Sequence, residues 1–167
     1  MHEIDEDFSD EFMAHVLGSH FVMTTKTLAQ LSGHPASDPP YETDIIRDIE
    51  IAWDTPLSRL TCRQVHDLVG QQFGLEWLAA PVAVFVRLYP AAICEFYSGD
   101  LTLAMLRAHE KFFQFAPAQM QDFLRCDLHG LSEYLDFDEG ELLAEASTLL
   151  NKARTLAGLS QANSRRH

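Results

Sequence analysis

Basic residues are scarce in this sequence of 167 residues. Twelve Lys and Arg stand against twenty-five Asp and Glu, which gives a formal net charge of −13 at pH 7. Nucleic acids and anionic membranes both favour Lys and Arg, so neither is expected as the main partner. The acidic excess indicates a basic protein partner, or simply a solvated surface that keeps the protein soluble.

Cysteine and long hydrophobic runs are also scarce. The three cysteines, Cys62, Cys94 and Cys126, are an odd number and none belongs to a C-x-x-C pair, so a disulfide framework is not expected. The N-terminus is acidic, whereas a signal peptide begins with a basic segment and an apolar run. The longest uninterrupted apolar run, Trp77 to Val86, is too short to cross a bilayer. We therefore expect a soluble cytoplasmic protein.

Catalytic and ligand-binding motifs are largely missing. There is no Gly-rich phosphate loop, no G-x-S-x-G and no H-E-x-x-H. The acidic segment Asp136 to Glu141 has its glycine at position five, where a calcium loop needs it at position six. His15 and His20 are five residues apart, and His66–Asp67 and His109–Glu110 are adjacent pairs, which on a helix point in different directions. No metal site and no cofactor are predicted.

A cysteine and a histidine that meet only in the folded protein remain an alternative basis for catalysis. Cys94 is followed by Glu95, whose charge would raise the pKa of the thiol and make it a poor nucleophile. Cys62 falls in the first turn of an expected helix but fits its apolar face. Buried hydrophobic roles are favoured for both, so we expect no enzyme.

The sequence does contain many apolar residues at helical spacing. Hydrophobic residues make up 47% of the chain, enough for a packed core in one domain. Thr61 with Gln64 three residues later is the strongest helix start signal, a capping box. The sequence predicts an all-α, compact bundle of about six to eight helices in a single domain, residues 1–160, followed by a flexible tail, residues 161–167. The expected helices cover residues 4–16, 21–31, 44–54, 62–73, 75–89, 101–112, 117–135 and 142–156.

Short motifs between residues 27 and 107 give the chain a family resemblance. They are TLAQL (Thr27 to Leu31), PPYETDIIRDI (Pro39 to Ile49), PLSRLT (Pro56 to Thr61), VGQQFGLEWL (Val69 to Leu78) with Pro81, and FYSGDL (Phe96 to Leu101). In these motifs the chain resembles the immunity proteins of bacterial contact-dependent growth inhibition systems. It departs from that pattern at Ser98, where the family has Pro, and in its acidic segment Asp44 to Asp54, where relatives often carry basic residues. Both ends of the chain are extensions without a counterpart.

The motif residues have structural interpretations of their own. Gly70 would permit close helix packing, Gly74 would end a helix, and Gly99–Asp100 would form a turn into a helix cap. The motifs therefore identify a scaffold and not a site. The residues that carry the likeness are Gly70, Gln71, Gly74, Leu75, Pro81, Phe96, Tyr97, Gly99 and Asp100.

What the resemblance implies is a protein that binds the C-terminal toxin domain delivered by a neighbouring cell and blocks it by stoichiometric occlusion. Such toxins are often nucleases with basic substrate grooves, which an acidic protein could oppose. The first 54 residues hold twelve acidic residues against Lys26 and Arg47, so they carry −10 of the total charge of −13. The candidate toxin-binding residues are the acids around the Pro-rich loop, with Tyr41 as an aromatic anchor. They are Asp38, Tyr41, Glu42, Asp44, Asp48, Glu50 and Asp54.

Other functions stay open on the sequence alone. One is the helical Cys/His-dependent enzyme described above, and another is an acidic adaptor or antitoxin, which the lack of a basic recognition helix disfavours. The apolar terminal helices leave a homodimer open as well.

Overall fold

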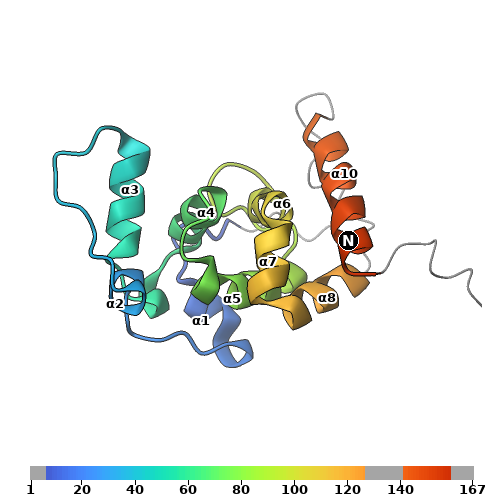
Figure 1. The fold of residues 1–167 in the computed structure, drawn as a ribbon, viewed down its shortest axis with the longest axis horizontal. Helices are drawn as coiled ribbons and strands as arrows, with labels where there is room; N and C mark the ends of the chain where they lie inside the picture. The colour runs from blue at the N-terminus through green and yellow to red at the C-terminus, as the bar shows by residue number, and fades with distance from the viewer. Residues whose placement is uncertain (1–6, 127–140, 159–167) are drawn as a thin grey trace, which may run out of the picture.

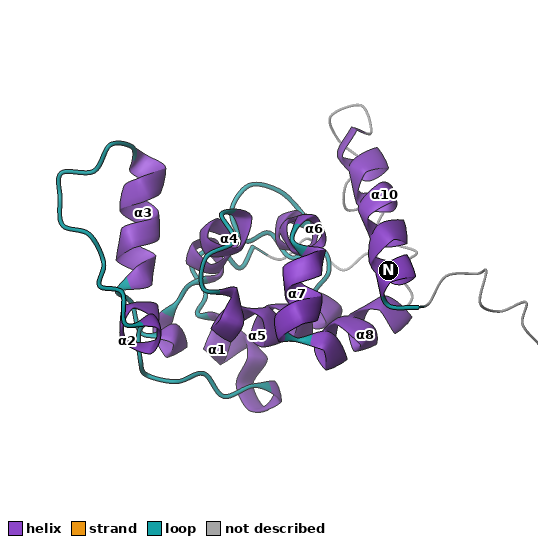
Figure 2. Cartoon of the chain, in the orientation of Figure 1, coloured by secondary structure: helices purple, strands orange, loops and turns teal. Residues whose placement is uncertain are grey.

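The computed structural model describes residues 7–126 and 141–158, and this part of the chain consists of helices joined by loops (Figure 1, Figure 2). It contains nine α-helices, two short 3-10 helices and isolated β-bridges but no strand. The all-α prediction is confirmed. The α-helices are α1 (Met13–Leu17), α2 (Leu28–Ser32), α3 (Asp44–Trp53), α4 (Cys62–Gly70), α5 (Leu75–Leu88), α6 (Asp100–Arg107), α7 (His109–Phe115), α8 (Pro117–Arg125) and α10 (Glu141–Leu156).

Helix α5 lies at the centre of the bundle, as its apolar sequence predicts. It packs against α1, α7 and α8, and its Phe85 is fully buried together with Phe112 of α7 and Phe123 of α8. Pro81 lies inside this helix and is buried, not in its first turn. Because proline has no N–H, it cannot donate the usual helical hydrogen bond to the carbonyl of Trp77.

Helix α4 connects this core to α3 on one side and to α6 on the other. The predicted capping box is present: Thr61 Oγ1 accepts the N–H of Gln64 at 3.2 Å, and Gln64 Oε1 accepts the N–H of Thr61 at 3.0 Å. The predicted end was wrong, since α4 stops at Gly70 and Phe73 is 48% exposed. Gly74 instead precedes α5 in the left-handed conformation, with φ +70°.

The N-terminal part is less helical than its periodicity predicts. Of the helix expected over residues 4–16, the described part, from residue 7, is helical only from Met13, and the helix expected over 21–31 begins only at Leu28. Residues 7–13 bond instead to distant backbone, with Phe8 N–H donating to the Ile93 carbonyl at 2.8 Å and Met13 N–H to the Leu60 carbonyl at 3.0 Å. These long-range hydrogen bonds replace helical ones. The local sequence does not show that such distant partners are present.

The C-terminal half follows the predicted order with one interruption. The helix expected over 101–112 is divided at Ala108 into α6 and α7, and His109 Nδ1 bonds to the Leu106 carbonyl at 2.8 Å beside the break. Pro117 opens α8 as predicted. Helix α8 ends at Arg125, short of the predicted end, because Cys126 is extended. The rest of that predicted helix, to residue 135, and the tail at 161–167 lie outside the described residues.

Helices α3 and α10 lie at opposite ends of the long axis of the molecule (Figure 1). Helix α10 is held against α6 by Arg107, whose guanidinium donates to both carboxylate oxygens of Glu145 at 2.7 and 2.9 Å. Helix α3 packs mainly against α4, where Ile49 and Ala52 are buried. Within residues 7–126 and 141–158, no helix has the length and apolar character needed to cross a membrane.

Candidate functional site

The predicted binding residues lie together on one projecting segment, residues 33–54, which we call the acidic arm. The arm consists of a loop followed by α3, and Figure 1 shows it at one end of the molecule. Helix α3 begins where the sequence predicts, because Thr43 Oγ1 accepts the N–H of Ile46 at 3.2 Å and Asp44 follows in the first turn. It ends at Trp53, with Asp54 as its C-terminal cap.

Three hydrogen bonds shape the acidic arm: two join its loop to α3, and the one between Tyr41 and Ser37 lies within the loop. Ser37 N–H donates to Glu50 Oε2 at 2.7 Å, the Tyr41 hydroxyl donates to the Ser37 carbonyl at 3.2 Å, and Trp53 Nε1–H donates to the His34 carbonyl at 2.7 Å. Glu50 and Tyr41 are therefore partly committed to shaping the arm. A partner would meet an ordered loop that needs little further ordering.

The charges of the acidic arm are mostly directed at solvent. Asp38, Glu42, Asp44 and Asp54 are exposed, while Asp48 and Glu50 are half-buried. Arg47 is the single basic residue among them and bonds to Asp44 at 3.2 Å and to Asp48 at 3.1 Å. Six carboxylates against one guanidinium leave the arm with a net charge of −5.

Sequence reasoning missed a set of exposed isoleucines on the same helix. Ile45, Ile46 and Ile51 are 48%, 38% and 50% exposed, between the acidic residues of α3. The signal was present in the sequence: the α3 segment DIIRDIEIAW has more isoleucines than one apolar stripe can bury. Large apolar side chains ringed by charge are typical of interaction surfaces.

A hollow of about 550 Å³ lies at the base of the acidic arm. Its aromatic walls are Trp53 of α3, Trp77 of α5 and Phe115 of α7, and Lys111, Glu76 and His34 add polar groups. Gly74, from the family-like motifs, lies in the same wall. The hollow thus continues the surface of the arm onto the body of the bundle.

A second group of titratable side chains lies beside α3, on α4 and on the loop before α6. His66 Nδ1 is 2.7 Å from Glu95 Oε2, and the Asp67 carboxyl also bonds to the Glu95 side chain. One ligand atom from each of His66, Asp67 and Glu95 lies within 4.8 Å of the others. The expectation that adjacent His66 and Asp67 would point apart was wrong, because Glu95, 29 residues from His66, meets both of them.

The environment of this group alters its proton affinities. Burial first, and then the hydrogen bond with Glu95 and the charges of Glu95 and Asp48, together raise the pKa of Asp67 to about 7, while His66 opposes them. Burial lowers the pKa of His66 despite nearby carboxylates. His66 is therefore neutral near pH 7, and its contact with Glu95 is a hydrogen bond from Nδ1–H to the carboxylate, not an ion pair.

The motif residues near this group act as supports. Asp100 is buried, and its carboxylate accepts backbone N–H groups from Cys94 at 3.0 Å and from Glu95 and Phe96 at 2.8 Å each. Gly99 takes φ +80° and caps α6, as the turn prediction requires, while Asp100 bonds the loop and not the helix end. Phe96 is 71% exposed, with its ring edge-on to His66 at 5.8 Å.

Two further motif predictions have different outcomes. Leu75 is buried at the start of α5, and a Cβ on Gly74 would lie 2.8 Å from Leu28 Cδ1, so this glycine allows close packing. Gly70 does not, since a Cβ there would meet nothing within 4 Å. Two other motif residues lie at the surface or close to it. Gln71, the C-terminal cap of α4, is exposed. Tyr97 is half-buried, and burial raises the pKa of its hydroxyl.

The two buried thiols, Cys62 and Cys94, offer no support for nucleophilic catalysis. Cys62 and Cys94 are fully buried, and the pKa of Cys94 is strongly raised, first by a hydrogen bond with Cys62 and then by burial. The predicted direction for Cys94 is confirmed, but its cause is the second thiol and not Glu95. A protonated, buried thiol is a poor nucleophile.

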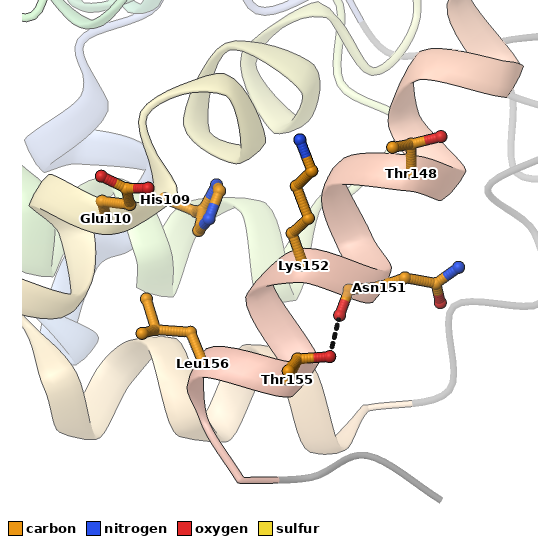
Figure 3. A pocket seen from close by; sticks show the side chains of 7 residues that line it. All are labelled: His109, Glu110, Thr148, Asn151, Lys152, Thr155 and Leu156. Carbon is orange, nitrogen blue, oxygen red and sulfur yellow. Dashed lines mark hydrogen bonds between the residues drawn. The ribbon is translucent and has the colours of Figure 1, made fainter.

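A second shallow hollow, also of about 550 Å³, lies between α7 and α10. Figure 3 shows the side chains that line it. His109 and Glu110 come from α7, and Lys152 and Asn151 come from α10. His109 Nδ1 is already bonded to the Leu106 carbonyl. The lining residues of this hollow carry opposite charges, on Glu110 and Lys152, and include no nucleophile paired with a base. The hollow is therefore a weaker candidate for a functional site than the acidic arm.

Comparisons of the chain with protein-family profiles, curated proteins and solved structures find no match.

Proposed function

We propose that the protein is an immunity protein, which binds the C-terminal toxin domain of a contact-dependent growth inhibition effector and blocks it by occlusion. The observation that supports this proposal best is the acidic arm, in which six carboxylates and three exposed isoleucines share one ordered projecting segment. The motif resemblance stated above gives the proposal its biological setting. The arm supplies the physical means of binding.

The proposed contact combines steering with apolar burial. A net charge of −5 on the arm would attract a basic toxin surface, such as a nuclease substrate groove, and speed the encounter. The isoleucines, and the aromatic side chains within the otherwise polar hollow at the base of the arm, would then supply apolar area that is removed from water and so hold the complex together. In this proposal Tyr41 is the aromatic anchor on the loop, and Trp53, which lines the hollow, is a second candidate; each also makes one hydrogen bond to the loop backbone.

The test is a titration of the full chain with the toxin domain encoded directly upstream of its gene. One-to-one binding is expected, and it should weaken with salt because the steering charges are exposed. A protein that fails to bind this domain, and fails to protect cells that express it, would rule the proposal out.

A matched pair of triple variants locates the surface. Asp38→Lys, Glu42→Lys and Asp54→Lys together change six charge units on the arm at exposed positions. Glu110→Lys, Asp122→Lys and Glu141→Lys make the same change at exposed positions on α7, α8 and α10. We expect the first set to weaken binding at least about tenfold more than the second. Equal losses from both sets, with both variants folded, would contradict the site.

A further inference from the structure

We propose that His66, Asp67 and Glu95 form a binding site for one divalent transition-metal cation, for which Zn²⁺ is the appropriate probe. The site lies on α4 and on the loop before α6, and it needs no toxin. The inference is independent of the proposed function.

The geometry suits a small cation. The three ligand atoms lie within 4.8 Å of one another, and they come from two segments that the fold brings together. Ligands about 2.0–2.1 Å from a tetrahedral zinc ion are about 3.3 Å apart. His66 Nδ1 and Glu95 Oε2, now 2.7 Å apart around a shared hydrogen, would separate only slightly if a cation replaced that hydrogen.

The donor atoms define which cation fits. A bound cation would displace the proton that Asp67 shares with Glu95, and the neutral imidazole with two carboxylates would then carry a charge of −2 that one divalent cation balances. Imidazole with carboxylates suits zinc and its transition-metal neighbours, whereas Mg²⁺ and Ca²⁺ prefer all-oxygen sites. The imidazole therefore distinguishes this group from a patch of surface acids.

The surroundings hold the ligands in place. Asp100 accepts the N–H of Glu95 and so fixes the backbone from which that ligand projects. The Phe96 ring packs edge-on against the His66 ring, with an interplanar angle of 81°. Outer contacts of this kind orient ligands before a metal arrives.

The site is also reachable from solvent. The His66 and Glu95 side chains are 15% and 13% exposed, so they are sheltered but not sealed. Three protein ligands leave the fourth position of a tetrahedral ion to water or to a group from a partner.

The experiment is a calorimetric titration of the chelator-treated full chain with Zn²⁺ alone, followed by Mg²⁺ at the same concentrations. We expect one Zn²⁺ per chain with a dissociation constant below about 100 μM, and no comparable Mg²⁺ binding. His66→Gln and Glu95→Gln should each weaken Zn²⁺ binding at least tenfold. His20→Gln, at an exposed histidine outside both the group and the acidic arm, should leave it unchanged.

Three results would overturn the proposal. They are no one-to-one Zn²⁺ binding in the wild-type chain, full binding retained in both His66→Gln and Glu95→Gln, or a bound Co²⁺ probe with sulfur charge-transfer absorption, which would assign the metal to a cysteine. If either variant fails to fold, the imidazole NMR signals of wild-type His66 decide: they must shift on Zn²⁺ addition, and unshifted signals would exclude the site.

Discussion

The buried carboxylate of Asp100 accepts the backbone N–H of Phe96 at 2.8 Å, and so displays an aromatic ring that is 71% exposed. The same carboxylate accepts the N–H groups of Cys94 and Glu95. One buried side chain therefore shapes the whole turn between α5 and α6. It also ties the family-like motif FYSGDL to the group of His66, Asp67 and Glu95.

Replacing Asp100 should cost much of the stability of the fold. Asp100→Ala removes the acceptor of three N–H groups in a buried turn, and we expect a loss of about 2–4 kcal/mol in the free energy of unfolding. Urea unfolding at pH 7 measures it. Asp38→Ala, an exposed acid of the acidic arm, is the control and should change stability by less than about 0.5 kcal/mol. A loss of similar size in both variants would contradict the role assigned to Asp100.

The two glycines of the V-G-Q-Q-F-G-L motif should respond in opposite directions. Gly74→Ala places a Cβ 2.8 Å from Leu28 Cδ1 at a residue with φ +70°, so we expect a loss of about 1–3 kcal/mol. Gly70→Ala adds a methyl group in open space at the end of a helix and should be neutral or stabilising by up to about 1 kcal/mol. Thermal melts of the two variants measure the difference. A destabilised Gly70→Ala variant would contradict the open space around Gly70.

Local signals predicted those parts of the fold that local interactions decide. The capping box at Thr61–Gln64, the start of α3 at Thr43, the buried helix α5 and the start of α8 at Pro117 all depend on neighbours within one helical turn. The sequence-based prediction was wrong where backbone groups bond to distant segments and not within a local helix. Phe8 and Met13 bond to Ile93 and Leu60 instead of forming helix, and no short window contains that information.

The candidate site also has one part that the sequence predicts and another part that depends on how the helices pack. The acidic arm was predictable because its six acids are close in sequence and polar residues beside a Pro-rich loop tend to be exposed. Glu95 could not be paired with His66 and Asp67 from sequence, since the contact depends on how α4 packs beside the loop before α6. The exposed isoleucines required knowledge of which face of α3 packs on α4.

Removing the N-terminal cap of α4 should destabilise the whole fold, whereas removing the cap of α3 should open only that helix. Thr61→Ala removes a cap on a helix packed between α3 and α6, so we expect about 1 kcal/mol of global destabilisation. Thr43→Ala removes the corresponding cap on α3, which projects from the bundle, and should mainly open that helix locally. Hydrogen exchange checks this: amides of residues 45–53 should exchange faster in Thr43→Ala while α5 amides stay protected. Faster exchange throughout the bundle would contradict a locally opening arm.

Thiol reactivity should separate the three cysteines. Cys62 and Cys94 are fully buried and Cys94 has a raised pKa, whereas Cys126 is partly exposed at the end of α8. We expect one thiol per chain to react with an alkylating reagent under native conditions, and all three after unfolding. Peptide mapping should identify Cys126, and Cys126→Ser should abolish the native reaction. Rapid modification of Cys62 or Cys94 at neutral pH would revive the case for a cysteine-dependent enzyme.

The ion pair between Arg107 and Glu145 should make the attachment of α10 pH-dependent. The hydrogen bonds from Arg107 hold the pKa of Glu145 below its ordinary value of 4.5. The folded protein therefore binds that proton less readily than the unfolded chain, so the pair stabilises the fold above pH 4.5, and this contribution is lost as the pH falls through the lower folded pKa. Because the Arg107 and Glu145 side chains are 48% and 39% exposed, the contribution at pH 7 should not exceed about 1 kcal/mol and should shrink in salt. Urea unfolding of Glu145→Gln against wild type should show a difference at pH 7 that shrinks steadily as the pH falls below 4.5, while Asp122→Asn, an exposed acid on α8, should show almost none at any pH. A Glu145→Gln difference that does not shrink as the pH falls would mean that packing of α10, and not the ionised carboxylate, carries the effect.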